Sequence, residues 1–339
     1  MGSEPRDRRH VAFLTGVTIE DAWRVSGWGH GTSEAIARMT AIQVRDLHKS
    51  YRGVPAVQGI SFSVEEGEVL ALLGPNGAGK TTTVEILEGF RARDSGLVEV
   101  FGFDPGKGER QYRERVGVVL QDTAVDKFLT VGETVELLGQ GYPSPLPVGE
   151  ALTFVGLSEQ RNTRVGKLSG GQRRRLDMAV GLAGDPALLF LDEPTTGFDP
   201  SARAEAWTTI QGLAARGTTI LLTTHYMEEA ERLANRVVIL TDGRVAAEGA
   251  PAELRSRRQT MTTVTFKLAA DSPAPPLGAR GTGGVFEVRV DDPTAALHTL
   301  TSWAVAAGLR LDDLEVTRAS LEDVYLDLTR AAEQEDAIR

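Results

Sequence analysis

Gly74-Pro-Asn-Gly-Ala-Gly79-Lys80-Thr81 stands between an apolar run at residues 69–73 and a run with helical spacing at residues 82–89. Glycines in this pattern let successive backbone N–H groups turn inward around phosphate oxygens, and the positive end of the following helix points at the same anion. Lys80 would reach the β- and γ-phosphates of a nucleotide, and the Thr81 hydroxyl would ligate Mg²⁺. A chance glycine-rich turn would need neither the strand nor the helix, so the stretch predicts a P-loop.

Further apolar runs resemble the one that precedes this loop. They occupy residues 187–191, 219–223 and 237–240. Short apolar runs separated by helical stretches are typical of buried strands in a largely parallel sheet. Residues 131–156 interrupt the alternation with a helical pattern and a proline-containing loop. We therefore expect an α/β domain over residues 39–250, with a helical insertion.

The rest of the chain divides into two segments. Residues 1–38 have no clear hydrophobic period and predict an irregular extension, either disordered or preceding a true start at Met39. Residues 251–339 predict a small α+β accessory domain. Its expected elements are strands at residues 262–268, 285–290 and 310–316, helices at 294–309 and 320–329, and a Pro/Gly-rich linker at 271–284.

The composition excludes several functional classes. Of the 339 residues, 41% are hydrophobic and 25% are charged, which permits a sizeable core. The net charge of −10 argues against a general nucleic-acid binder, and we expect the run Arg173–Arg175 to lie near nucleotide phosphates or in solvent. The absence of cysteine excludes disulfides, thiolate metal sites and a catalytic thiol. No stretch has the pattern of a membrane span or a secretory signal.

Two acidic residues follow another apolar run. Asp192 ends this run at the expected carboxyl edge of a parallel strand, where ligands bind in such sheets, and Glu193 comes next. Asp192 would hold Mg²⁺ directly or through water, and Glu193 could polarise an attacking water as a general base. Alone, the pair could equally begin a loop; downstream of a P-loop, the functional interpretation is favoured.

Leu168-Ser-Gly-Gly-Gln172 precedes a helical pattern and predicts a second anion-binding corner. Ser169 takes the N-cap position, and Gly170 and Gly171 expose backbone N–H groups at the helix start. A bare Ser-Gly-Gly before a helix is common, so this stretch alone would also fit an ordinary loop.

The P-loop, the Leu-Ser-Gly-Gly-Gln stretch and a strand ending in Asp-Glu, in this order, resemble the ATP-binding subunit of an ABC transporter. The resemblance covers residues 40–250. It implies a P-loop NTPase fold of the ABC ATPase type, with a mixed sheet core and a helical subdomain. It also implies ATP and Mg²⁺ as cofactors.

Four further positions match the family one at a time. Gln121 resembles the Q-loop residue, which senses Mg²⁺ or the attacking water, and His225 resembles the switch histidine, which contacts the γ-phosphate. Asp199 resembles the D-loop residue, although the family usually has Leu where this chain has Phe198. Tyr51 resembles the aromatic residue that stacks on adenine, but it could also pack against the sheet.

The resemblance thus implies three groups of site residues. Catalysis would involve Glu193, His225, Gln121 and Lys80, and the metal would be held by Thr81, Gln121 and Asp192. The nucleotide would be bound by Tyr51, Gly74, Pro75, Asn76, Gly77, Ala78, Gly79, Lys80, Thr81, Thr82, Ser169, Gly170, Gly171, Gln172 and Asp199.

The family mechanism also implies partners. Each of two ATP molecules would be held by the P-loop of one subunit and the Ser169–Gln172 corner of the other. The chain has one of each, so a second ATPase subunit, expected to be another copy, is implied. An integral membrane permease subunit would complete the assembly at the cytoplasmic face of the cell membrane, and nucleic acid is not expected.

The C-terminal sequence narrows the family. Residues 319–329, Ala-Ser-Leu-Glu-Asp-Val-Tyr-Leu-Asp-Leu-Thr, resemble the tail of daunorubicin-resistance-type ATP-binding subunits, which serve exporters. Leu321, Val324, Tyr325 and Leu328 have the spacing of an amphipathic helix, which could pack within its own domain or contact another subunit. The implied function is ATP hydrolysis that powers efflux of a drug-like or antibiotic compound through a separate membrane subunit.

Alternatives remain within the same ATPase class. A DNA-maintenance ATPase usually carries a long coiled coil or a zinc insertion between the P-loop and the Leu-Ser-Gly-Gly-Gln stretch. This chain has neither heptads nor cysteine there. Translation-factor relatives carry two ATPase cassettes, and this chain has one P-loop. An importer subunit shares every catalytic motif, and only the C-terminal resemblance disfavours it.

Overall fold

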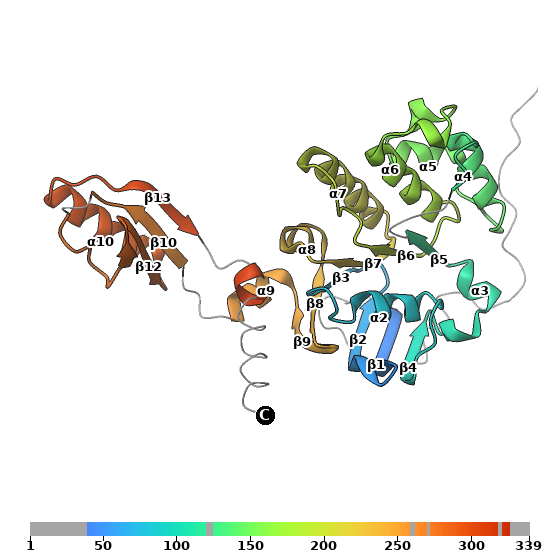
Figure 1. Ribbon diagram of the computed structural model, residues 1–339, viewed down its shortest axis with the longest axis horizontal. Helices are drawn as coiled ribbons and strands as arrows, with labels where there is room; N and C mark the ends of the chain where they lie inside the picture. The colour runs from blue at the N-terminus through green and yellow to red at the C-terminus, as the bar shows by residue number, and fades with distance from the viewer. Residues whose placement is uncertain (1–38, 120–124, 258–261, 270–271, 318–320, 326–339) are drawn as a thin grey trace, which may run out of the picture. The chain divides into compact units, whose positions relative to one another are not determined.

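The computed structural model describes residues 39–119, 125–257, 262–269, 272–317 and 321–325 (Figure 1). The strands are β1 (Thr40–Tyr51), β2 (Val54–Glu65), β3 (Val69–Leu73), β4 (Ser95–Val100), β5 (Val116–Val119), β6 (Leu188–Asp192), β7 (Thr219–Thr224), β8 (Arg236–Thr241), β9 (Arg244–Gly249), β10 (Thr262–Lys267), β11 (Arg280–Thr282), β12 (Val285–Val290) and β13 (Asp312–Thr317). The α-helices are α2 (Lys80–Leu87), α3 (Arg110–Arg113), α4 (Val131–Gly139), α5 (Val148–Phe154), α6 (Gly170–Gly181), α7 (Pro200–Ala215), α8 (Met227–Leu233), α9 (Pro251–Arg257) and α10 (Pro293–Ala306).

A six-stranded sheet carries the central region, in the order β5-β6-β7-β3-β8-β9. All neighbouring pairs are parallel except β8 and β9. Strands β3 and β7 are buried along their whole length, because elements cover both faces of the sheet. The expected largely parallel sheet is therefore confirmed, and each uninterrupted apolar run belongs to one of its inner strands.

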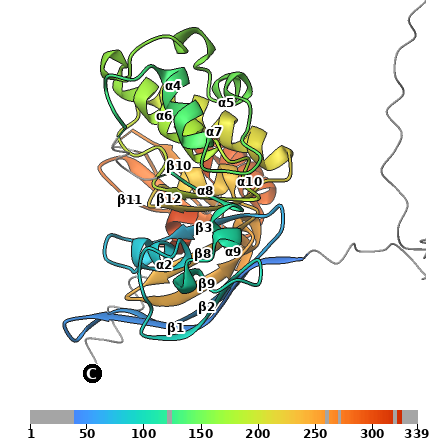
Figure 2. The ribbon, with the colours of Figure 1, turned by 90° about the vertical axis from the view of Figure 1, so that its right-hand side faces the viewer.

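A second, antiparallel sheet has the order β2-β1-β4. Helix α2 lies between it and the six-stranded sheet (Figures 1 and 2). Val84 and Ile86 of α2 share one buried cluster with Leu72 of β3 and Ile42 of β1. The start of α2 is thus fixed from two sides, and the preceding loop lies at the carboxyl end of β3.

The helical insertion predicted from residues 131–156 is confirmed. Helix α4 begins with a capping box in which Thr130 and Glu133 bond to each other's backbone N–H. Helices α4, α5 and α6 pack together, and their buried residues join the cluster that covers one face of the six-stranded sheet. The mixed sheet core with a helical subdomain agrees with the expected fold class.

Residues 262–317 form a four-stranded sheet in the order β11-β12-β10-β13, with helix α10. Val264, Phe266 and Leu300 are among its buried residues. The expected strands and helix are confirmed, but the linker predicted over residues 271–284 was wrong in part, because it contains β11. Gly283 and Gly284 both have positive φ and form the two-residue turn of a β11-β12 hairpin.

Residues 321–325 are helical. Leu321 is fully buried in the same cluster as Leu233 of α8 and Leu254 of α9, and its N–H donates to Glu231 Oε1 at 2.9 Å. The described part of the tail therefore packs within this chain. Its contacts lie partly in its own expected domain, at α9, and partly in the central region, at α8 between β7 and β8. Residues 1–38 and Leu328 lie outside the described residues.

Within the part of the chain that the structure describes, no helix combines the length and the hydrophobicity that crossing a bilayer requires.

Candidate functional site

The loop at residues 74–79 joins β3 to α2 through left-handed glycines. Gly77 and Gly79 have φ angles of 87° and 95°, which glycine adopts at little cost. A Cβ atom on Gly74 would lie 2.4 Å from the carbonyl oxygen of Leu240, and one on Gly79 would lie 2.5 Å from that of Ala56. Positions 74 and 79 therefore have to be glycine, and the close backbone packing that they permit suits a cradle of N–H groups for phosphate oxygens.

Lys80 is the first residue of α2 and is only 5% exposed. Its Nζ donates to the carbonyl oxygens of Gly74 and Pro75 at 2.8 and 3.1 Å. Burial lowers the pKa of Lys80, and the negative charges of Glu193 and Asp192 partly oppose this shift. The Lys80 ammonium thus contacts the loop at residues 74–79 and interacts electrostatically with the carboxylates of Asp192 and Glu193.

Asp192 ends β6 directly beside Thr223 of β7. The Thr223 hydroxyl donates to Asp192 Oδ1 at 2.5 Å. Burial raises the pKa of Asp192; the Thr223 hydrogen bond opposes this, the charge of Glu193 adds to it, and Lys80 opposes it. The carboxylate is consequently oriented by one neighbour and destabilised by its surroundings, which favours a bound cation.

Glu193 has a φ angle of 46°, in the left-handed region that costs a non-glycine residue roughly 1–2 kcal/mol. Its N–H donates to the carbonyl and hydroxyl oxygens of Thr223 at 3.2 and 3.0 Å. Its Oε2 accepts from the Thr196 hydroxyl at 3.0 Å, and its Oε1 lies 3.3 Å from Nδ1 of His225. Glu193 and His225 therefore meet at the ends of the adjacent strands β6 and β7.

The residues at this edge fit a magnesium nucleotide. Thr81, in the first turn of α2, is exposed, and Asp192 is half-buried beside Lys80. A hydroxyl and a carboxylate are the hard oxygen donors that Mg²⁺ prefers, while the bare glycine backbone and Lys80 suit phosphate. Gln121, the third expected metal ligand, lies outside the described residues.

The Leu-Ser-Gly-Gly-Gln stretch forms a capped helix start. The Ser169 hydroxyl accepts from the N–H of Gln172 at 3.2 Å, and Gln172 Oε1 accepts from the N–H of Ser169 at 3.0 Å. The expected N-cap position of Ser169 is confirmed. Gly170 is exposed in the first turn, where backbone N–H groups have no partner within the helix, so this corner can donate to an anion.

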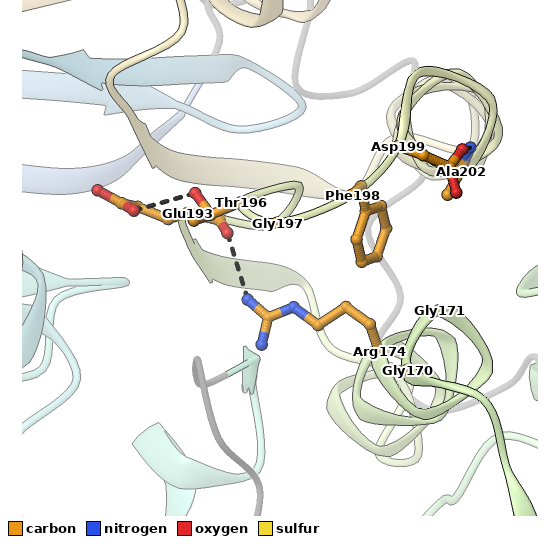
Figure 3. Close-up of a pocket in the computed structure, with 9 residues that line it drawn as sticks. All are labelled: Gly170, Gly171, Arg174, Glu193, Thr196, Gly197, Phe198, Asp199 and Ala202. Atoms are coloured by element: carbon orange, nitrogen blue, oxygen red, sulfur yellow. Dashed lines mark hydrogen bonds between the residues drawn. The ribbon is translucent and has the colours of Figure 1, made fainter.

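A pocket separates this corner from the loop between β6 and α7 (Figure 3). Asp199 caps α7 by accepting from the N–H of Ala202 at 2.9 Å. Phe198, the position where the related family usually has Leu, points into the pocket from the loop. The pocket is lined by Gly170, Gly171, Arg174, Glu193, Thr196, Gly197, Phe198, Asp199 and Ala202.

The expectation for the arginine run was wrong at its middle residue. Arg173 is exposed, and Arg175 lies 3.4 Å from a carboxylate oxygen of Glu205. Arg174, however, is only 9% exposed, because it lies on the inward face of α6. Its guanidinium donates to the backbone carbonyls of Asp192, Glu193 and Pro194 at 3.3, 3.3 and 3.5 Å.

Tyr51 ends β1 with 37% of its surface exposed. The guanidinium of Arg91 lies 5.1 Å from the ring centroid and the ammonium of Lys49 lies 5.7 Å from it. Arg91 is held in turn by Glu85 at 2.5 Å. The ring is therefore not buried in the sheet, and a flat, accessible aromatic face suits a base.

Comparison with known proteins agrees with this geometry. The ABC transporter family model matches residues 57–196, and a model described as the C-terminal domain of ABC transporter domain-containing protein-like chains matches residues 262–320. The daunorubicin resistance ATP-binding protein DrrA2 of Streptomyces coeruleorubidus is 38% identical over 309 residues, which cover 85% of this chain and 95% of that protein. This chain belongs to the ABC transporter ATP-binding proteins.

Two further relatives of this ABC protein are informative. The Nod factor export ATP-binding protein I of Paraburkholderia xenovorans is 45% identical, over 63% of this chain and 72% of that one. A solved dimeric ATP-binding cassette in a post-hydrolysis state, bound to ADP and Pi, superposes with a TM-score of 0.56 at 25% identity, over 62% of this chain and 98% of that one.

Proposed function

We propose that this chain is the ATP-hydrolysing subunit of an exporter and that it powers efflux of a drug-like or antibiotic compound through a separate membrane permease. One observation supports ATP hydrolysis. Glu193 contacts His225, and the neighbouring Asp192, which accepts from Thr223, interacts electrostatically with Lys80. Similarity to a daunorubicin resistance ATP-binding protein over 85% of this chain supports the export part.

Each side chain has a distinct role in this proposal. The loop from Gly74 to Thr82 and Lys80 bind the phosphates, and Tyr51 stacks on the adenine. Thr81, Gln121 and Asp192 would hold Mg²⁺, which would neutralise charge on the phosphate oxygens. Glu193 takes the proton of the attacking water, and His225, 3.3 Å from Glu193 Oε1, contacts the γ-phosphate.

The active form in this proposal contains two ATPase subunits. The exposed corner at Ser169–Gln172 of one copy, together with Asp199, completes the nucleotide site that begins at the P-loop of the other. Closure excludes bulk water from around the γ-phosphate and the attacking water, which strengthens every electrostatic contact there. The pair of subunits sits on the cytoplasmic face of the membrane, where its permease partner lies.

A pull-down from native membranes tests the proposal. The bait is the Glu193→Gln form with ATP and Mg²⁺, which should accumulate in the closed state, and the matched control is the same form without nucleotide. With ATP and Mg²⁺, we expect a multi-helix membrane protein to be recovered in an amount nearly equal to that of the bait. Its recovery should differ in the control without nucleotide. Recovery of soluble proteins or nucleic acid alone would overturn the transport role and leave the ATPase chemistry standing.

Turnover of the same variant tests the chemistry separately. Loss of the general base in Glu193→Gln should lower steady-state ATP hydrolysis by about 10²–10⁴-fold while ATP binding persists. Near-normal turnover would remove Glu193 from the proposed role.

A further inference from the structure

We propose that Arg174 is a positioning residue that holds the backbone of Glu193 and connects it to α6, the helix that Ser169 caps in the same copy. This inference rests on the proposed hydrolytic role of Glu193. The inferred action of Arg174 is on the segment that carries two of the expected site carboxylates, Asp192 and Glu193.

Three hydrogen bonds of Arg174 are directed at one short stretch of chain. A single guanidinium donates to three successive backbone carbonyls, those of Asp192, Glu193 and Pro194 (Figure 3 shows the bond to Glu193). Arginine suits this task because its planar fork presents five N–H donors and stays charged at any accessible pH. The side chain is buried, so water cannot easily replace these bonds if it is removed.

Glu193 has a particular need for such support. Its φ angle of 46° lies in the left-handed region, so its backbone is held by neighbours rather than by its own preference. Thr223 binds the N–H side of the residue, and Arg174 binds the carbonyl side. Together they fix the direction in which the Glu193 side chain leaves the backbone.

The position of Arg174 on α6 gives this support a second consequence. It lies in the second turn after Ser169, on the helix whose N-terminus lines the pocket opposite the Asp199 loop. In the two-copy arrangement, that N-terminus meets ATP bound by the other subunit. Arg174 therefore couples the binding of one nucleotide to the orientation of Glu193, the general base that acts on the other nucleotide.

The test compares Arg174→Gln with Arg173→Gln, the exposed neighbour, in the full chain. We expect Arg174→Gln to lower turnover at saturating ATP by about 10- to 100-fold, the loss typical of a small misplacement of a reacting group, with the KM for ATP changed by less than about twofold. The Arg173→Gln control should hydrolyse ATP at the wild-type rate. Arg174→Lys keeps the positive charge but lacks the planar guanidinium, so its turnover should lie between that of Arg174→Gln and that of the wild type. It also serves as the test if Arg174→Gln does not fold.

A double-mutant cycle identifies the route of the effect. If Arg174 acts through Glu193, adding Arg174→Gln to Glu193→Gln should lower single-turnover hydrolysis by less than about twofold further. If the rate losses of the two single variants multiply in the double variant, the positioning role is overturned. Wild-type turnover of both Arg174→Gln and Arg174→Lys would overturn it as well. Failure of the proposed function would give a different result: the wild-type chain would not hydrolyse ATP, or Glu193→Gln would hydrolyse it normally.

Discussion

Glu88, at the end of α2, is a buried acid whose Oε1 has no hydrogen-bond partner among the described residues. Burial, with the nearby charges of Asp192 and Glu85, raises its pKa to about 8 from an ordinary value of 4.5. The folded protein therefore keeps this proton over a range in which the unfolded chain has lost it.

The pH dependence of stability follows from that shift. Because the folded pKa is raised, the contribution of Glu88 to stability is complete below pH 4.5 and is lost as the pH rises towards 8, an effect on the order of a few kcal/mol. Urea unfolding at pH 5 and pH 8 should show this loss in the wild type and much less of it in Glu88→Gln. Equal pH slopes in Glu88→Gln and in the exposed control Glu66→Gln would contradict the assignment.

Thr223 supports two expected site residues at once, since it donates to Asp192 and accepts from the N–H of Glu193. Thr223→Val keeps the shape but removes both bonds of the hydroxyl. Asp192 then loses its hydrogen-bond donor, at a cost of roughly 1–3 kcal/mol for a charged group left unpaired, while the Glu193 N–H keeps the Thr223 carbonyl as its acceptor. We expect at least about a tenfold fall in turnover and a higher Mg²⁺ requirement. Thr223→Ser, which keeps the hydroxyl, should stay close to wild type; an equal loss in both variants would argue for a packing effect instead.

The site residues differed in how visible they were in the sequence. Gly74–Thr81, Asp192 and His225 follow apolar runs, so strand ends predict where they gather. Thr223 was not singled out, because its role depends on register between β6 and β7. Arg174 looked like part of a solvated run, and only the 3.6-residue period of α6 separates it from its two neighbours.

At the scale of the elements, strands with two buried faces were the easiest to predict, because their apolar runs are uninterrupted. The strands β1, β2 and β4 alternate buried and exposed residues and are broken by bulges, so the sequence analysis did not define them. Strand β11 has three exposed residues, which give no hydrophobic signal. Its position is set instead by the Gly283-Gly284 turn and by pairing with β12.

The helical residues 321–325 lend themselves to a stability test. Leu321 is fully buried, so Leu321→Ala should leave a cavity and lower the free energy of unfolding by about 2–5 kcal/mol. Thermal unfolding of the full chain is the measurement, with Glu322→Ala, an exposed neighbour, as control. An unchanged transition in Leu321→Ala would mean that the tail does not stabilise the region around α8.

At the scale of the whole molecule, the proposed assembly depends on the exposed corner at Ser169. An arginine there would place a bulky side chain where the nucleotide of the other copy must sit. Ser169→Arg should therefore bind ATP but fail to dimerise with it on a sizing column, in the Glu193→Gln background that otherwise favours dimers. Normal dimerisation of this variant would contradict the two-copy arrangement.

Trp207 gives the protein an optical reporter of its own. Its indole N–H donates to Glu229, and the same carboxylate oxygen accepts from Thr195, two residues beyond Glu193. The other tryptophans are Trp23, Trp28 and Trp303, so a Trp303→Phe chain beginning at Met39 would emit from Trp207 alone. Movement of the Glu193 loop during a turnover would change the field at that indole, and the fluorescence of a single side chain would follow the catalytic cycle without any added dye.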